Sequence, residues 1–169
     1  LGENVFSNCG ISAFVVDPDN SRYYSLEGVL FDDSEKYLIQ YPNQKEAVDT
    51  YTIPEGIEKI GNSAFIGAQV GTVVIPASLK VINSGAFWLN QFTTIEIPNT
   101  VERIEQNAFS GSRKLTEVTI PGSVKVIEQS GFGSCDNLKH VVIEDGTEWL
   151  QDYAFNKNPR LESITIPSS

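Results

Sequence analysis

The sequence predicts a mainly β solenoid. It should be a right-handed stack of about seven short coils, with a parallel β-sheet on one face and short turns, 3₁₀ turns or helical turns on the other. Three observations support this fold. An Ile-Pro pair recurs along the chain, an Ala-Phe pair recurs in phase with it, and both share a period of 22 or 23 residues. Such internal repeats define the fold as a whole.

The two markers keep a constant phase over five periods. Successive isoleucines are 22, 22, 23, 23 and 23 residues apart, and an Ala-Phe pair (Gly-Phe once) follows each of the first five at 11 and 12 residues. Two independent markers that keep the same spacing indicate a true internal repeat and not a chance pattern. The isoleucines are Ile53, Ile75, Ile97, Ile120, Ile143 and Ile166, and the phenylalanines are Phe65, Phe87, Phe109, Phe132 and Phe155.

One repeat illustrates how each coil should form. Leu115, Val118 and Ile120 alternate closely enough for a short strand with its apolar side inward. Pro121 ends that strand, because proline fixes φ and cannot donate to the ladder. Val124 then begins a return segment over the back of the coil, for which a helix, a 3₁₀ turn and a further strand all stay open.

Stacking buries the apolar face that a single repeat cannot bury, with Ile on Ile and Phe on Phe from coil to coil. The period falls within the roughly 20–29 residues of leucine-rich repeats, so the predicted fold is a leucine-rich-repeat solenoid. We expect one domain over residues 1–169, as a fragment of a longer array. Its seven strand registers lie near residues 11–16, 48–53, 70–75, 92–97, 115–120, 138–143 and 161–166.

An insertion at about residues 17–47 interrupts the first coils. Val29–Phe31 and Tyr37–Ile39 flank the turn Asp32–Lys36 and predict a β-hairpin, and Asp17–Asn20 predicts another turn. Insertions in solenoids form loops on one face and sometimes carry binding. The alternative is that the hairpin only packs its aromatic side chains on the flank of the stack. Four of the six tyrosines lie here and are candidates for binding: Tyr23, Tyr24, Tyr37 and Tyr41.

The repeat unit Leu-x-x-(Ile/Val)-x-Ile-Pro-x-x-Val-x-x-Ile-x-x-x-Ala-Phe resembles the BspA-like leucine-rich repeat over nearly the whole chain. Tyr24–Phe31 followed by Leu38–Pro42 resembles an insertion common in that family. The resemblance implies a secreted or surface-anchored bacterial protein, and some members of the family bind host matrix proteins or other bacteria. The chain departs from the pattern at Glu144 and Thr147, where proline and valine are expected, so we expect that coil to be irregular.

Composition and motifs argue against several classes of function. A net charge of −10 and an isoelectric point of about 4.5 disfavour nucleic acid and anionic lipid, because Lys and Arg bind such ligands. No apolar run approaches the roughly 18 residues of a membrane helix. The sequence has no phosphate loop, no Cys-x-x-Cys pair and no nucleophile elbow, so we expect neither an enzyme nor a bound cofactor.

Potential metal ligands are too few for a specific site. His140 is the only histidine, and its expected neighbours on adjacent strands are Glu117 and Ser163. A pair of ligands does not make a metal site. Asp17 and Asp19 resemble the start of a calcium loop, but the acid and glycine that should follow are missing, so we predict a turn and no metal.

The two cysteines each lie three residues after a phenylalanine, Cys9 after Phe6 and Cys135 after Phe132. At about 4.8 Å per strand they would lie four coils and about 19 Å apart. A disulfide needs Cα atoms within about 7 Å. We therefore predict two free, buried thiols.

The outward side of the predicted strands is the main candidate surface. Stacking would form a two-column face rich in threonine, of the kind that solenoids use for extended binding. The alternative is a solvated sheet without a ligand. Trp88 and Trp149 are possible exposed anchors. The candidate binding residues are Thr50, Thr72, Thr94, Glu96, Glu117, Thr119, His140 and Ser163.

Together these features favour an extracellular or cell-surface module for protein binding or adhesion, in a bacterial surface or secreted protein. Its partner would be a host or bacterial extracellular protein, with no nucleic acid and no membrane insertion in this segment. One alternative is a non-catalytic structural spacer in a larger surface protein. A carbohydrate-binding module ranks lower, because the outward columns offer no aromatic side chain to a sugar. Exposed end strands also permit edge-to-edge association between copies.

Overall fold

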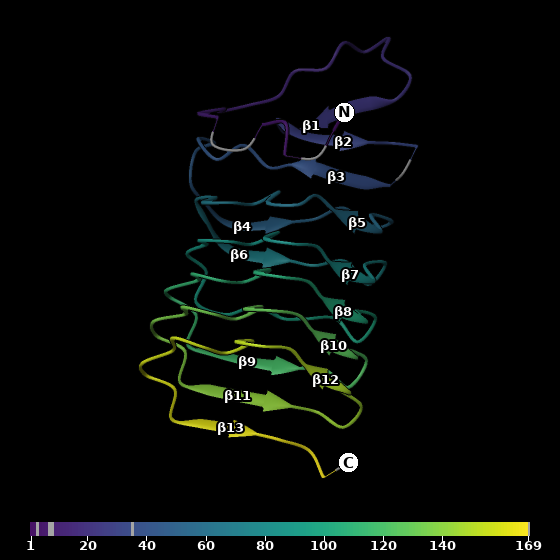
Figure 1. The fold of residues 1–169 in the computed structure, drawn as a ribbon. Coiled ribbons are helices and arrows are strands. Elements are labelled where there is room, and N and C mark those ends of the chain that lie inside the picture. Colours follow the sequence, from purple (N-terminus) through teal and green to yellow (C-terminus); the bar gives the residue numbers. More distant parts are fainter. Residues whose placement is uncertain (3, 7–8, 35, 169) are drawn as a thin grey trace.

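The computed structural model describes residues 1–2, 4–6, 9–34 and 36–168, and its body is a stack of coils with two parallel ladders of strands (Figure 1). We call them the front ladder and the second ladder. The front ladder consists of β4 (Val48–Thr52), β6 (Val70–Val74), β9 (Glu117–Ile120), β11 (His140–Ile143) and β13 (Ser163–Thr165). The second ladder consists of β5 (Lys59–Ile60), β7 (Val81–Ile82), β8 (Arg103–Ile104), β10 (Val126–Ile127) and β12 (Trp149–Leu150).

The front strands form where the sequence alternates. In β9, Val118 and Ile120 are buried while Glu117 and Thr119 are exposed, and β11 repeats the pattern. The strands fall on five of the seven predicted registers. The segment 92–97 holds a sixth place in the stack without being a strand.

The seventh predicted register, 11–16, is not a strand. Its backbone bonds instead to the insertion, since the Phe14 N–H donates to the Gly28 carbonyl and the Gln44 N–H donates to the Ile11 carbonyl, at 2.8 and 2.9 Å. The stack therefore has about six coils, one fewer than predicted.

The return side of the coils carries two-residue strands joined by turns, and no helix occurs among the residues that the structure describes. Of the forms that stayed open for the return segment, the structure has turns and further short strands. None of the described residues forms a helix that could cross a membrane.

A column of stacked aromatic rings fills the interior of the coils. Successive ring centroids lie 4.7–5.4 Å apart, close enough for stacking contacts worth about 0.5–1.5 kcal/mol each. The predicted phenylalanines form this column, and Tyr41 of the insertion extends it beyond Phe65. Its members are Tyr41, Phe65, Phe87, Phe109, Phe132 and Phe155.

A second interior column is polar, and we did not predict it. From Phe87 on, the side chain three residues after each phenylalanine donates a hydrogen bond to the interior phenylalanine carbonyl of the preceding coil. Ala68 holds this position in its coil and has no donor, and the ring above Phe65 is that of Tyr41. The insertion supplies the donor instead, because Gln40 Nε2 donates to the Tyr41 carbonyl at 3.2 Å. The other donors are Asn90, Ser112, Cys135 and Asn158.

The insertion is a three-stranded antiparallel unit of β1 (Tyr23–Leu26), β2 (Val29–Asp32) and β3 (Tyr37–Gln40). The predicted hairpin is therefore confirmed as β2 and β3; Glu35 of its predicted turn lies outside the described residues. β1 extends it through a two-residue turn in which Glu27 and Gly28 both have positive φ. β3 pairs in parallel with β5, so the insertion forms one sheet with the first strand of the second ladder, while β7, β8, β10 and β12 form a separate sheet.

Candidate functional site

The front face, meaning the outward side chains of the front ladder, is arranged as two columns. His140 pairs with Glu117 on one side and Ser163 on the other, which confirms the predicted neighbours. Thr119 pairs in the same way with Val142, and Thr50 pairs with Thr72 in the upper part of the stack. Of the predicted surface residues, all are exposed except Thr72, which is half-buried.

His140 has polar partners at the surface of this face. Its Nδ1 lies 3.0 Å from Ser163 Oγ, and its Nε2 lies 4.0 Å from a carboxylate oxygen of Glu162. Within the described part of the chain, no three His, Cys, Asp or Glu residues gather as metal ligands.

The front face is interrupted at residues 92–97. Neither β6 nor β9 pairs with this segment, and its backbone makes one hydrogen bond to a neighbouring coil, from the Thr116 N–H to the Thr93 carbonyl at 3.1 Å. Figure 1 shows the gap between the arrows of β6 and β9. The free edge of β9 therefore faces a segment that, apart from the Thr93 carbonyl, makes no backbone bond to it.

A groove of about 340 Å³ lies along this interruption. Its floor consists of Ile95, Ile97 and Val118, of which the two isoleucines are 7% and 6% exposed. The equivalent side chains of β11 are better covered, since Val141 is 1% exposed. The remaining residues that line the groove are Thr94, Glu96, Asn99, Glu117, Thr119, Pro121 and Glu144.

The interruption coincides with a change in repeat length. From Phe65 to Val70 and from Phe87 to Phe92 the chain takes five residues, whereas from Phe109 to Leu115 it takes six. The extra residue lies in the turn just before β9, so β9 is the first front strand that follows a six-residue turn. We expect this change of turn length to keep β9 from pairing with the segment above it.

Phe92 adds a second cause. It holds the position that valine or leucine holds in the other coils. Its larger ring packs edge-on against the rings of Phe87 and Phe109, with centroids 6.1 and 6.2 Å away. We expect the bulk of this ring to keep the segment from pairing with β6 as well, where the turn lengths agree.

Charge on the groove is one-sided. Three carboxylates line it, those of Glu96, Glu117 and Glu144, and no Lys or Arg does. The carboxylates of Glu96 and Glu117 make no ion pair or hydrogen bond with any described residue. Glu144 accepts one hydrogen bond, from the Gly122 N–H at 3.2 Å.

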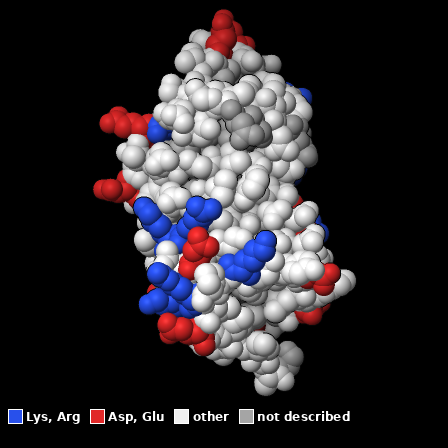
Figure 2. All heavy atoms as spheres, turned by 60° about the vertical axis from the view of Figure 1, so that its left-hand side comes forward, with Lys and Arg blue, Asp and Glu red and all other residues white. Residues whose placement is uncertain are grey.

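Cations gather elsewhere, over the turns that precede β9, β11 and β13. Figure 2 shows Lys and Arg side chains clustered over the lower half of this side, with acidic groups among them. Arg113 lies 3.5 Å from the Asp136 carboxylate, Arg160 donates to the Asn137 side chain, and Lys139 lines the same shallow pocket as Arg160. The groove therefore carries carboxylates only, whereas this other side carries cations with acidic groups among them.

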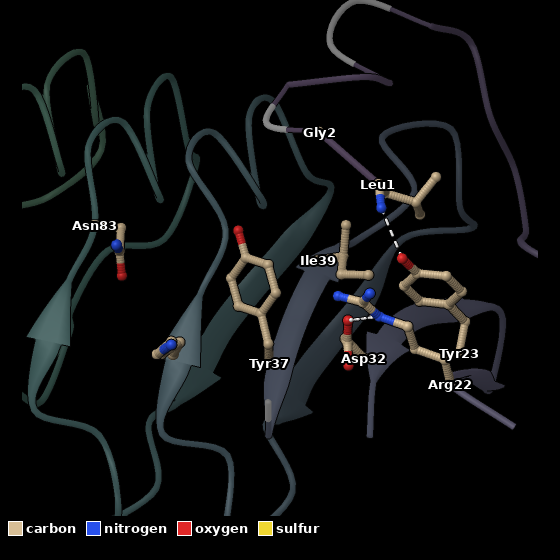
Figure 3. A pocket seen from close by; sticks show the side chains of 9 residues that line it. Leu1, Gly2, Arg22, Tyr23, Asp32, Tyr37, Ile39 and Asn83 are labelled. Atoms are coloured by element: carbon tan, nitrogen blue, oxygen red, sulfur yellow. Dashed lines mark hydrogen bonds and ion pairs between the residues drawn. The ribbon is translucent and has the colours of Figure 1, made fainter. Parts of the chain in front are cut away.

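The insertion brings two of its predicted tyrosines to a second pocket, of about 390 Å³ (Figure 3). Tyr23 and Tyr37 line it, and both are half-buried. Arg22 lies over the Tyr23 ring, with its Cζ 5.2 Å from the centroid. The other residues that line the pocket are Leu1, Gly2, Asp32, Ile39, Lys59 and Asn83.

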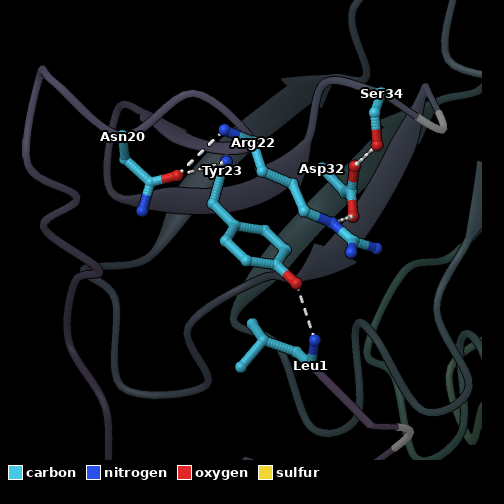
Figure 4. Close-up of polar contacts among 6 residues, drawn as sticks. All are labelled: Leu1, Asn20, Arg22, Tyr23, Asp32 and Ser34. Atoms are coloured by element: carbon cyan, nitrogen blue, oxygen red, sulfur yellow. Dashed lines mark hydrogen bonds and ion pairs between the residues drawn. The ribbon is translucent and has the colours of Figure 1, made fainter.

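Internal contacts hold the polar groups of this second pocket (Figure 4). The Arg22 guanidinium donates to Asp32 at 2.8 Å, Ser34 Oγ donates to the other Asp32 oxygen at 2.6 Å, and the Leu1 amine donates to the Tyr23 hydroxyl at 2.6 Å. These bonds are structural, so this pocket is a weaker candidate than the groove.

Asp17–Asn20 forms the turn that we predicted, since the Asp19 N–H donates to the Asp17 side chain.

The other two tyrosines of the insertion serve the core. Tyr24 stacks on Phe31 with centroids 4.9 Å apart, and Tyr41 is 1% exposed within the aromatic column. Tyr41 as a binding residue was therefore wrong, because the Phe65 ring covers it. For these two residues the structure favours the alternative reading, a hairpin that packs its aromatics on the stack.

Both cysteines are free, as predicted, but only one is buried. Cys135 has neighbouring coils on both sides, and its burial raises the pKa of the thiol to about 12, which leaves it protonated and unreactive at neutral pH. Cys9 is exposed, contrary to the prediction. It lies in the first described turn, where a coil covers it on one side only, as the neighbouring Gln40 and Tyr41 show.

The coil that starts at Glu144 keeps its register, so the irregularity we expected there was wrong. The Glu144 N–H donates to the Ile120 carbonyl at 3.0 Å, and Trp149 of β12 pairs with Val126.

Trp88 and Trp149 are 41% and 62% exposed. Trp149 lies on the second ladder, so it cannot anchor a ligand on the front face.

Comparison with known proteins agrees with this architecture. The family model for BspA-type leucine-rich repeat regions matches residues 1–91 and 82–169, with six copies. No curated protein matches the chain significantly.

Solved structures of similar fold come from bacterial proteins. A leucine-rich cell surface protein of Faecalibacterium prausnitzii shares 25% identity at a TM-score of 0.84, over 99% of this chain and 45% of that one. The pneumococcal vaccine antigen PcpA shares 25% identity at a TM-score of 0.81, and the match covers 90% of this chain and 38% of that one. A leucine-rich repeat protein of Bacteroides ovatus shares 25% identity at a TM-score of 0.55, and the match covers 91% of this chain and 47% of that one. The chain thus spans less than half of each of these proteins.

Proposed function

The chain belongs to the family of BspA-type leucine-rich repeat regions, and on that premise we propose that it is an extracellular protein-binding module of a bacterial surface or secreted protein. Its contact surface is the front face. The groove at residues 92–97 carries the proposal, because it is the one place on that face where apolar floor, free strand edges and uncompensated charge coincide. Binding clefts combine these properties.

Two further observations support the proposal. The similar Faecalibacterium chain is a cell surface protein, and PcpA is a vaccine antigen. Regular stacking also holds the front columns in fixed positions, so that a ligand meets a preorganised surface and loses little affinity to ordering it. A spacer would need no such groove.

The test is binding of the purified chain to an array of extracellular matrix proteins, mucins and bacterial surface proteins. We expect saturable binding to at least one protein. A variant with Thr94→Ala, Glu117→Ala and His140→Ala should bind it at least about tenfold more weakly, because interface energy is concentrated in few residues.

The matched control carries Lys80→Ala, Glu102→Ala and Glu148→Ala. These exposed residues occupy one column that leads into the second ladder, since the backbone bonds from Glu102 to Lys80 and from Glu148 to Lys125 follow it. The control should bind as the parent chain does. Equal binding by both triple variants would reject the front face, and silence across the array from a folded chain would favour a structural spacer.

A further inference from the structure

We propose that the groove binds an extended peptide segment in which lysine or arginine alternates with apolar residues, by adding it as a strand along β9. This inference deepens the proposed function, on which it rests, by naming the chemistry of the partner. Three properties of the groove support it: the free strand edge, the apolar floor and the acidic rim.

The free edge accounts for the extended conformation. β9 pairs with β11 on one side only, and the residues of segment 94–97 on its other side make no ladder bonds. Such an edge presents a row of N–H and C=O groups that a peptide backbone can satisfy. The edge of Glu117–Ile120 is four residues long, or about 13 Å at strand rise, so it accepts about four residues of a ligand.

Shape sets where the ligand enters. The hydrogen bond from the Thr116 N–H to the Thr93 carbonyl, 3.1 Å long, closes one end of the groove, and no backbone bond joins the two described segments further along. The open end lies near Pro121 and Glu144. The volume of about 340 Å³ is at the lower end of the roughly 300–1,000 Å³ of ligand pockets, which suits a short stretch of one chain.

Side-chain chemistry sets the alternation. Successive residues of a strand point to opposite sides, so every second side chain of the ligand would face the floor of Ile95, Ile97 and Val118. The others would face outward toward Glu96 and Glu117, whose carboxylates have no partner among the described residues. Apolar residues therefore fit the first set, and lysine or arginine fits the second.

Net charge supports the same sign of ligand. The chain carries −10 overall, which attracts a cationic segment from a distance and speeds its encounter. An acidic segment or a polyanion would meet three carboxylates and no Lys or Arg at this site.

The experiment is a titration of the isotope-labelled 169-residue chain with capped pentapeptides, followed by NMR of the backbone amides and by calorimetry. The probe alternates lysine with valine. We expect shift changes concentrated in Thr94–Ile97 and Glu117–Ile120. A pentapeptide that alternates glutamate with valine should leave these amides unchanged.

Two comparisons separate strand addition from simple charge attraction. A lysine-valine probe with N-methylated valines keeps its charge but loses ladder donors, and should bind about tenfold more weakly. The variant Glu96→Gln, Glu117→Gln, Glu144→Gln should also lose about tenfold, because it removes three exposed charge pairs.

The matched control Glu46→Gln, Glu102→Gln, Glu148→Gln removes the same net charge from exposed positions away from the groove and should change the affinity less than about twofold. Equal affinity of the methylated probe, equal affinity of the two glutamine variants, or shift changes on another face would each overturn the proposal. Protein binding in the array with none of these peptide effects would leave the proposed function intact and reject this inference alone. Peptide binding at the groove without a protein partner in the array would reject the proposed function as a protein-binding module and leave the peptide site intact.

Discussion

The two ladders of the solenoid respond differently to the same change in repeat length. The second ladder pairs without interruption from β7 through β8 and β10 to β12, whereas the front ladder is split at residues 92–97. Both ladders pass through the same coils, so the difference lies in where each is placed relative to the added residue.

Spacing within the repeat explains this difference. From the front isoleucine to the second-ladder position the chain always takes seven residues, as from Ile97 to Ile104 and from Ile120 to Ile127. From there to the phenylalanine it always takes five, as from Ile104 to Phe109. The only variable stretch lies between the phenylalanine and the front strand. The added residue therefore lies directly before the front strand and is absorbed before the second ladder, so we expect it to act on the front ladder alone.

What carries the stack across the split is its interior. The aromatic column has a centroid spacing of 5.3 Å between Phe87 and Phe109, next to the interruption, and of 4.7 Å between Phe109 and Phe132 beyond it. The interior is continuous where the front ladder is not, so core contacts and not front hydrogen bonds should set the stability there.

The largest expected effect comes from breaking the aromatic column. Phe109→Ala should lower the free energy of unfolding by about 3–5 kcal/mol, because it leaves a cavity between two stacked rings. Phe92→Leu is the matched change in the split segment, and it should cost clearly less, since leucine occupies this place in later coils. Urea unfolding followed by circular dichroism measures both. A Phe92→Leu cost equal to that of Phe109→Ala would mean that the column is not what bridges the split.

Much of this fold could be predicted from the sequence, because stacking identical positions requires little beyond the period. The recurrence of Ile120 and Phe109 at fixed spacing is enough to predict that both are buried in the stack, and the exposure of His140 follows from strand alternation. The second ladder stayed one of three open alternatives for the return segment, since two-residue strands such as Val126–Ile127 leave no alternation to detect.

The groove could not be predicted in the same way. The lengths of 22 and 23 residues are visible in the sequence, but whether a coil absorbs one residue in a turn or at the sheet depends on packing around Phe92. Tyr41 was misplaced because it lies outside the phenylalanine pattern, and Cys9 because its register position says nothing of how many coils cover it.

A smaller effect should follow from cutting the interior polar column. Asn158 makes three hydrogen bonds: Nδ2 donates to the carbonyls of Phe132 and Phe155, and Oδ1 accepts from the Cys135 N–H at 2.7 Å. Asn158→Ala should therefore cost about 1–3 kcal/mol, because backbone groups lose their partners. Ser112→Ala, which removes one long bond of 3.4 Å, is the control and should cost less than about 1 kcal/mol. Equal costs in urea unfolding would contradict a role for this column.

The smallest effect on stability, and the most direct test of the comparison, comes from equalising the turns. Inserting one serine between Asn90 and Gln91 gives the coil before β9 a six-residue turn like those that follow. The split segment should then pair with β9, and amide hydrogen exchange at Glu117–Ile120 should slow by at least about tenfold, because exposed edge amides become ladder donors. Stability should change by less than about 1 kcal/mol, since new ladder bonds replace bonds to water. A serine inserted after Asp19, in the exposed turn of the insertion, should leave that exchange unchanged. Unchanged exchange in the first variant would show that turn length does not open the groove, and would leave the ring of Phe92 as its cause.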